Sequence, residues 1–494
     1  MFGHCDPEAN DMRRLSNILR MGIFLAGGGL LFLGVIEANA ANYYISPTGN
    51  DTSGNGTTGN PWKTLDKAMS VGSGGDTYIF KDGAYNYAGI ELDASIKNGS
   101  AGAYTTIRAE NDGGAVITQM DGFNLDGGAY VKIEGFKFNY AGSKLIYKSN
   151  HIKVLRCAMQ GGPSSGNTVQ GDATESSYIL FEDCWFYGPG GRYNLLIYYS
   201  DHVIARRCVF RHDGGWSDTK GDPEAVTNAY TSSYVYYQNC IILDSTSAYY
   251  TNPYGGFYQT TDTAVSNISW EGCIAINGTN SAFGIDPKSG NSSTILTIKD
   301  CVAYGYQDGI YAQPGAALTI LRATVGALTG PGDAAISRYG GSVSASYCDV
   351  FNNANGNFNG VTPTYSNSYP TSQSGTGNVN VDPRTNGLLY LPRTENGSFL
   401  ATHQAGGRMG AQIVNRIGVS GTLYGDTGWN VDTGESLWPF PNETRIKADM
   451  SSVSTRGFCA AGMSLTKYIW EYLGNAMPVF GGKKPSAPII IGVQ

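Results

Sequence analysis

Hydrophobic and polar positions repeat through the middle of this 494-residue chain in a frame of eight residues. The frame reads apolar, any, apolar, any, any, cysteine, any, apolar, as in the stretch from Ile152 to Met159. Nine copies begin at residues 131, 152, 179, 203, 235, 268, 296, 318 and 343, so successive copies lie 21 to 33 residues apart. A period in this range is typical of a solenoid, whose repeats bury their apolar faces against their neighbours.

The frame also indicates which solenoid forms. Alternation at period two on both sides of a two-residue corner predicts two short strands that meet at a bend, with both apolar sets on the same side. No long amphipathic helix lies between the copies, which argues against helical and leucine-rich repeats. We therefore predict an all-β fold, a single-stranded parallel β-helix, in which each strand pairs with the equivalent strand of the next turn, or coil.

Cysteine is the residue that marks most copies of the frame. The seven frame cysteines are Cys157, Cys184, Cys208, Cys240, Cys273, Cys301 and Cys348. Equivalent positions stack in a β-helix, so these residues are predicted to form an inward ladder, where cysteine behaves as a small hydrophobic residue. Parallel side chains on adjacent rungs do not supply the dihedral angle of a disulfide, so we predict free, buried thiols.

The two ends of the chain differ from the repeat. Arginines at 13, 14 and 20 precede an apolar run over residues 22–36 and the small residues Ala38 and Ala40, a pattern that predicts a signal peptide over residues 1–40. We therefore expect an exported protein, extracellular or periplasmic, that is free of the membrane after cleavage; a retained anchor is the alternative.

Two short helices are predicted outside the frame copies. Residues 64–71, after Pro61, form an amphipathic helix suited to covering the open end of the β-helix, whose coils we place within residues 41–380. Residues 381–494 are predicted to be an irregular extension. Its helix over residues 464–473 would pack along the coils or cap their end.

The opening of the coil region resembles a known group of proteins. The segments SPTGND at 46–51, NPWKTLDKA at 60–68 and GDTYIFKDGAY at 75–85 resemble the start of secreted right-handed parallel β-helix proteins of the pectate-lyase-like superfamily. With the repeat, the resemblance covers residues 43–350 and implies a right-handed coil. The WIDH, NTD and GHG motifs of its well-known pectate lyases and polygalacturonases are absent from the chain, so no catalytic residue carries over.

Three consecutive long connections, over residues 187–194, 211–224 and 243–256, give the positional clue to function. Long loops on adjacent coils project side by side and wall a groove. From 193 to 258 the chain holds 11 of its 33 tyrosines. An aromatic and polar groove suits a polysaccharide, because ring faces stack on sugars and polar groups bind their hydroxyls. The predicted substrate contacts are Tyr193, Trp216, Tyr250, Tyr254 and Tyr258.

Charged residues in the same connections supply candidate catalysts. Eliminative cleavage of a uronate needs a base for the C5 proton and cations that neutralise the carboxylate. Lys220 could be the base, with Arg192 or Arg211 as the neutralising cation, and His212 is the histidine candidate because it follows a core strand directly. An exposed lysine in a salt bridge is the alternative interpretation of Lys220.

Asp218, Asp222 and Glu224 lie within seven residues and could bind Ca²⁺, which prefers oxygen ligands. Their spacing matches no calcium-binding motif, and solvated loop carboxylates are the alternative. The net charge of −7 argues against nucleic acid as a partner.

His151 and His202 each stand just before the first apolar residue of a copy, where other copies place Tyr178, Tyr234 and Asn267. This shared position predicts an outward row of corner residues rather than a metal site.

These features together favour an exported carbohydrate-active protein, with a polysaccharide lyase acting on an acidic glycan as the leading hypothesis. A glycoside hydrolase is a close variant, which would need two groove carboxylates about 5 to 10 Å apart. A non-catalytic glycan-binding or spacer protein is the alternative from another class. The glycan, the bond and the oligomeric state are left open by the sequence.

Overall fold

The computed structural model describes residues 40–86, 91–92, 96–118, 124–141, 145–161, 169–188, 193–213, 225–245, 255–287, 294–330, 334–383 and 408–474. The predicted signal peptide lies outside these residues except for Ala40. No helix in this part of the chain is both long and apolar enough to span a bilayer.

Almost all of the described strands belong to three long sheets. Sheet 1 consists of β1 (Asn42–Ile45), β2 (Thr77–Phe80), β5 (Thr105–Ala109), β8 (Ala129–Glu134), β11 (Asn150–Leu155), β14 (Ser177–Glu182), β17 (Asp201–Arg206), β20 (Ser233–Gln238), β23 (Val265–Glu271), β26 (Thr294–Lys299), β29 (Ala316–Leu321) and β32 (Ser342–Ser346). Sheet 2 consists of β3 (Gly83–Tyr85), β6 (Ala115–Ile117), β9 (Lys137–Ala141), β12 (Ala158–Gly161), β15 (Trp185–Gly188), β18 (Val209–His212), β21 (Ile241–Leu243), β24 (Ile274–Ile276), β27 (Val302–Tyr304), β30 (Thr324–Gly326), β33 (Asp349–Phe351) and β35 (Asn367–Tyr369). Sheet 3 consists of β4 (Glu91–Leu92), β7 (Asn124–Asp126), β10 (Ile146–Tyr147), β13 (Val169–Thr174), β16 (Tyr193–Tyr198), β19 (Thr227–Tyr230), β22 (Phe257–Thr261), β25 (Ser281–Pro287), β28 (Asp308–Ala312), β31 (Ile336–Arg338) and β34 (Phe358–Asn359).

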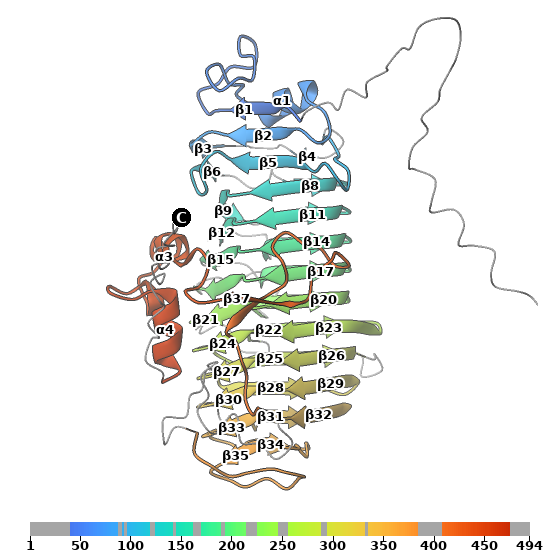
Figure 1. Ribbon diagram of the computed structural model, residues 1–494, viewed down its shortest axis with the longest axis vertical. Coiled ribbons are helices and arrows are strands. Elements are labelled where there is room, and N and C mark those ends of the chain that lie inside the picture. Colours follow the sequence, from blue (N-terminus) through green and yellow to red (C-terminus); the bar gives the residue numbers. More distant parts are fainter. Residues whose placement is uncertain are drawn as a thin grey trace, which may run out of the picture. The chain divides into compact units, whose positions relative to one another are not determined.

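Each complete coil passes through sheet 1, sheet 2 and sheet 3 in turn, and the next coil stacks on it in parallel (Figure 1). The first apolar position of the sequence frame pairs in register from coil to coil: Ile152 with Ile179, Ile179 with Val203 and Val203 with Val235. The predicted right-handed parallel β-helix is therefore confirmed. β1, β2 and β5 extend sheet 1 towards the N-terminus beyond the nine copies of the frame.

The frame cysteines form the predicted ladder inside the coils. All seven are free and buried. Each lies at the corner between sheets 1 and 2 and points its thiol at backbone carbonyls; Cys240 Sγ lies 3.2 Å from the Ala205 oxygen of the preceding coil. Burial raises the pKa of the Cys348 thiol to about 12, which keeps it protonated and unreactive at neutral pH.

The N-terminal helix α1 (Leu65–Val71) packs against the first coil, as predicted. The hydroxyl of Thr64 caps it by accepting a hydrogen bond from the Lys67 amide at 3.2 Å. Leu65, Ala68 and Met69 are buried in the same apolar cluster as the coil interior. The helix thus covers apolar surface at an end where no further coil stacks.

The C-terminal extension packs along the outer face of sheet 2, one of the two placements that its sequence allowed. In the described part of the extension the helices are α3 (Glu443–Ser451) and α4 (Leu465–Tyr472) (Figure 1), with the 3₁₀ helix η2 (Gly457–Cys459) between them. Ile446 and Ile469 from these helices share one buried apolar cluster with Trp185 and Ile241 from the strands. Where these helices cover it, sheet 2 is therefore buried on both of its faces.

The segment before these helices crosses the outer face of sheet 1. It contains the antiparallel pair β36 (Asn415–Ile417) and β37 (Asp432–Ser436). Leu423 between them is buried against Leu180 and Ile204 of the sheet. The fully buried Arg206 donates hydrogen bonds to the backbone oxygens of Val419 and Trp429, each at 2.8 Å, and so holds the segment in place.

The predicted outward row of corner residues also exists. The rings of Tyr130, His151, Tyr178, His202 and Tyr234 stack in that order, with successive centroids 4.4, 4.7, 4.6 and 4.4 Å apart. All five residues have positive φ, which turns the backbone at the corner into sheet 1. Neighbouring rings are inclined by only 6 to 19°, so the row is a face-to-face stack.

The ladder leads to the first testable prediction. Cys240→Ala should lower the free energy of unfolding by only about 1 to 2 kcal/mol, because a small cavity replaces the thiol, whereas Cys240→Asp should prevent folding by burying an unpaired charge. Chemical denaturation measures the first effect. A thiol reagent should label the ladder cysteines slowly in the native wild-type protein and rapidly once the protein is denatured. Fast labelling of the native protein would contradict the buried ladder.

Candidate functional site

Four of the predicted site residues lie within the described chain: Arg211, His212, Tyr193 and Tyr258. The other eight lie outside the described residues, and their roles stay predictions: Arg192, Trp216, Asp218, Lys220, Asp222, Glu224, Tyr250 and Tyr254. The predicted calcium ligands all belong to this second group, so the calcium site is not tested.

Arg211 does not stand at the root of a groove loop. It lies in β18 and its side chain is fully buried beneath the C-terminal extension. Its guanidinium donates to the Met450 carbonyl at 2.8 Å and lies 3.1 Å from Cys459 Sγ, and its Nε forms an ion pair with Asp213 Oδ1 at 3.0 Å. The prediction that Arg211 belongs to the connection over residues 211–224 is therefore wrong, because Arg211 lies in β18 and its side chain projects from the face of sheet 2 that α3 covers. These contacts indicate that Arg211 anchors the C-terminal extension to sheet 2.

His212 follows Arg211 in β18 and is buried as well. Its backbone carbonyl accepts a hydrogen bond from Arg456 Nη2 at 3.0 Å. The C-terminal extension thus contacts the strand end on which both residues lie. The catalytic roles assigned to the pair stay predictions, and their burial argues against direct contact with a polymer.

Tyr193 and Tyr258 are brought together on the outer face of sheet 3. They form one buried cluster with Ala225 and Tyr311. A Cβ at Gly284 would lie 2.6 Å from the ring of Tyr258 and 2.7 Å from that of Tyr311, so the absence of a side chain there lets both rings lie close to the sheet. These rings support the face rather than project from it, and their contact with substrate stays a prediction.

Three other tyrosines gather at the surface on the same sheet. Tyr198 of β16 stacks on Tyr230 of β19 with centroids 5.1 Å apart, and Tyr199 meets Tyr198 edge to face at 4.5 Å. Tyr199 is 45% exposed, and the other two are partly exposed. We call Tyr198, Tyr199 and Tyr230 the tyrosine platform.

Carboxylates border the platform. The Tyr230 hydroxyl donates a hydrogen bond to Asp262, and Tyr258 donates to Asp286 Oδ2 at 3.1 Å. Burial and this hydrogen bond raise the pKa of Tyr230, so its phenol stays protonated at neutral pH. The face therefore combines aromatic rings with hydrogen-bond acceptors.

One row of side chains extends the platform along neighbouring coils. Lys148, Glu175, Tyr199 and Thr231 occupy equivalent corners between sheets 3 and 1, all with φ between 46 and 47°. This left-handed backbone turns each side chain outwards. Lys148 Nζ lies 4.6 Å from the Tyr147 ring centroid, which places a cation beside an aromatic ring two coils from Tyr199.

The tyrosine platform could have been found from the sequence, since its three residues belong to the tyrosine-rich stretch from 193 to 258. What the sequence alone did not give is which tyrosines lie outside the buried cluster. That distinction depends on which residues of each sheet 3 strand point outwards. It also depends on Gly284, whose missing side chain lets the rings of Tyr258 and Tyr311 lie close to the sheet.

Comparison with known proteins gives no family assignment: no family model and no curated protein matches this chain. Solved structures with a similar chain path include pectate lyase Pel9A, at 16% identity and a TM-score of 0.46 over 62% of this chain and 78% of that one. Another is XylC in complex with xylose, at 8% identity and a TM-score of 0.44 over 69% and 86%. A mannuronic acid specific family 6 lyase from human gut microbiota has 14% identity and a TM-score of 0.35 over 71% and 85%. At these values the likenesses assign no residue and no activity to this chain.

The buried position of Arg211 leads to a second prediction. Arg211→Ala should lower the free energy of unfolding by about 3 kcal/mol, because it breaks a buried ion pair and removes donors from two partners in the extension. Arg338→Ala, which removes an exposed arginine, should change it by less than about 0.5 kcal/mol. Denaturant titration of both variants checks this; a fully stable Arg211→Ala protein with a large loss of turnover would instead support the catalytic assignment.

Proposed function

We propose that this chain is an exported carbohydrate-active protein that binds a polysaccharide along the outer face of sheet 3. The observation that carries the proposal is the tyrosine platform with its bordering carboxylates. Ring faces of tyrosine pack on the apolar faces of sugars, while Asp262 and Asp286 can accept hydrogen bonds from hydroxyls. Export rests on the sequence of residues 1–40.

The outer faces of the other two sheets are partly covered by the chain itself. The C-terminal extension covers much of the outer face of sheet 2, and the segment with Leu423 crosses sheet 1. The three long connections also lead into sheet 3, because they precede the strands that begin at Tyr193, Thr227 and Phe257. Strands of a sheet lie about 4.8 Å apart, so features on successive coils repeat at a spacing that an extended polymer can follow.

For the reaction, we propose eliminative cleavage of a uronate-containing glycan. A base removes the C5 proton, the C4–O bond breaks, a double bond forms between C4 and C5, and the departing oxygen takes up a proton. Lys220 is the proposed base, and Arg192 or a Ca²⁺ ion held by Asp218, Asp222 and Glu224 would neutralise the uronate carboxylate. These residues belong to the connections that precede sheet 3 strands.

The test combines the platform with the base. Incubation with a panel of uronate polymers should release unsaturated product, detected by its ultraviolet absorbance. Lys220→Ala should lower turnover by about 100-fold or more with binding retained, and Tyr199→Ala should weaken polymer binding by about tenfold because one stacked ring is lost. Lys63→Ala, an exposed lysine near α1, is the matched control and should behave as the wild type.

Different outcomes contradict different parts of the proposal. Release of reducing ends without unsaturated product would replace the lyase with a hydrolase. Binding without any cleavage would leave a non-catalytic glycan-binding protein. Polymer binding that Tyr199→Ala leaves unchanged would move the binding face away from the tyrosine platform.

A further inference from the structure

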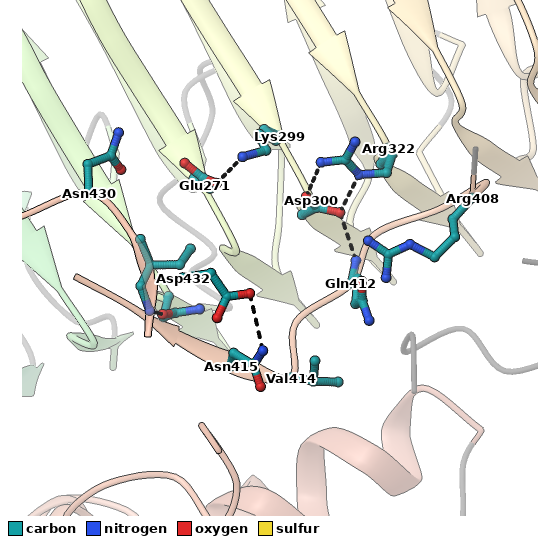
Figure 2. A pocket seen from close by; sticks show the side chains of 12 residues that line it. Glu271, Lys299, Asp300, Arg322, Arg408, Gln412, Val414, Asn415, Asn430 and Asp432 are labelled. Atoms are coloured by element: carbon teal, nitrogen blue, oxygen red, sulfur yellow. Dashed lines mark hydrogen bonds and ion pairs between the residues drawn. The ribbon is translucent and has the colours of Figure 1, made fainter. Parts of the chain in front are cut away.

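A pocket of about 270 Å³ lies at the corner between sheets 1 and 2, away from the tyrosine platform (Figure 2). Its inner wall comes from the corners of successive coils, with Asn239, Asp300 and Arg322. Its outer wall is the segment that crosses the coils, with Arg408 and Asp432. The pocket therefore exists only while this segment is docked on the β-helix.

The pocket opens where the row of corner side chains is interrupted. Asn239, Gly272, Asp300 and Arg322 occupy equivalent corners of four coils, all with positive φ. Gly272 contributes no side chain, and a Cβ there would stand 2.6 Å from Asn239 Nδ2. The amide of Asn239 thus lies over the gap in the row.

Most charges around the pocket are already paired. Arg322 donates two hydrogen bonds of 2.9 and 2.6 Å to the carboxylate of Asp300. The backbone N–H of Gln412 donates to the same carboxylate at 3.0 Å. Lys299 forms an ion pair with Glu271 (Figure 2). These pairs neutralise four of the six charged side chains that line the pocket.

Asn239 and Arg408 carry donors of the pocket wall that have no partner among the described residues. Asn239 is 1% exposed; its Oδ1 accepts a hydrogen bond from the Ile417 amide at 2.7 Å, but its Nδ2 has no partner among the described residues. A buried donor without an acceptor destabilises the fold unless a ligand or water satisfies it.

Arg408 is the second donor. It is half-buried and has no hydrogen bond or ion pair to any residue in the described ranges. Burial lowers the pKa of Arg408, and so does the positive charge of the neighbouring Arg322. Asp300 has the opposite effect but does not outweigh them, so the positive charge of Arg408 is only partly compensated.

We propose that this pocket binds a small hydroxylated monocarboxylate, such as a single uronic acid, with its carboxylate on Arg408 and another of its oxygens on Asn239 Nδ2. The carboxylate accepts from the guanidinium, and a hydroxyl or ring oxygen of the same ligand accepts from the Asn239 amide. Glu271 and Asp432 on the pocket wall accept hydrogen bonds from ligand hydroxyls, and their negative charge disfavours a dianion such as phosphate. The volume is too small for a polymer. This site is separate from the reaction proposed on sheet 3 and does not depend on it.

Binding here would stabilise the docked segment, because the ligand bridges the coils and the segment at once. The experiment titrates the full-length protein with D-glucuronate by calorimetry and follows the melting temperature. The wild type should bind and melt at a higher temperature, whereas D-glucose, which lacks the carboxylate, should do neither, and phosphate should bind more weakly than glucuronate.

Arg408→Ala should weaken glucuronate binding by about tenfold or more, since it removes a charge-assisted hydrogen bond. Asn239→Asp, which keeps the acceptor oxygen for Ile417 and removes the donor, should weaken it similarly. Arg416→Ala is the matched control, because it removes an arginine of the same segment that does not line the pocket.

The binding measurement separates this site from the proposed active site. Lys220→Ala should bind D-glucuronate as the wild type does. The proposal is overturned if the folded wild type does not bind glucuronate, if glucose or phosphate binds as tightly, or if Arg408→Ala binds unchanged. Loss of binding in Lys220→Ala with retention in Arg408→Ala would place glucuronate on sheet 3 instead.

Discussion

Sheet 2 must be covered on both faces, and the position of the C-terminal extension depends on this requirement. A strand with one solvent-facing side alternates apolar and polar residues, but Trp185, Phe186 and Tyr187 of β15 are consecutive, large and buried. The same holds for Ile241, Ile242 and Leu243 in β21. Without a covering layer, these outward rings and aliphatic chains would form a large exposed apolar surface. The helices α3 and α4 supply that layer.

Buried arginines complete the attachment of the extension. Arg211 reaches α3 from sheet 2, and Arg206 binds the backbone of the segment that crosses sheet 1. Arg207 beside it pairs with Asp183 and Glu182. Removing charges from water is costly unless their donors are satisfied, so these side chains favour one docked arrangement of the extension over others. In the pocket at Gly272, Asn239 Nδ2 is one of the buried donors along this contact that have no hydrogen-bond partner among the described residues.

The sequence predicted the repeat, the register, the cysteine ladder and both short terminal helices, because each depends on local alternation or on stacking of equivalent positions. The eight-residue frame did not extend to the first strands of sheet 1, because five residues, 110–114, separate β5 from β6 where the frame expects a two-residue corner. It also gave no sheet 3, whose strands can be as short as Ile146–Tyr147 and show no period. The position of Arg211 was predicted wrongly because a strand end next to a long connection was assumed to be exposed. That assumption holds only where no other segment packs on the sheet, and here α3 does. The consecutive apolar residues of β15 and β21 were the available sign that something does.

The central claim is that the coils and the C-terminal extension fold as one unit through the outer face of sheet 2. Hydrogen exchange followed by mass spectrometry on the full-length protein tests it most directly, because amides of one cooperative unit exchange through the same unfolding event. The account predicts that peptides from α3 and α4 are protected to the same degree as peptides from β15 to β27. Rapid exchange of the two helices, with the strands of sheet 2 still fully protected, would contradict it.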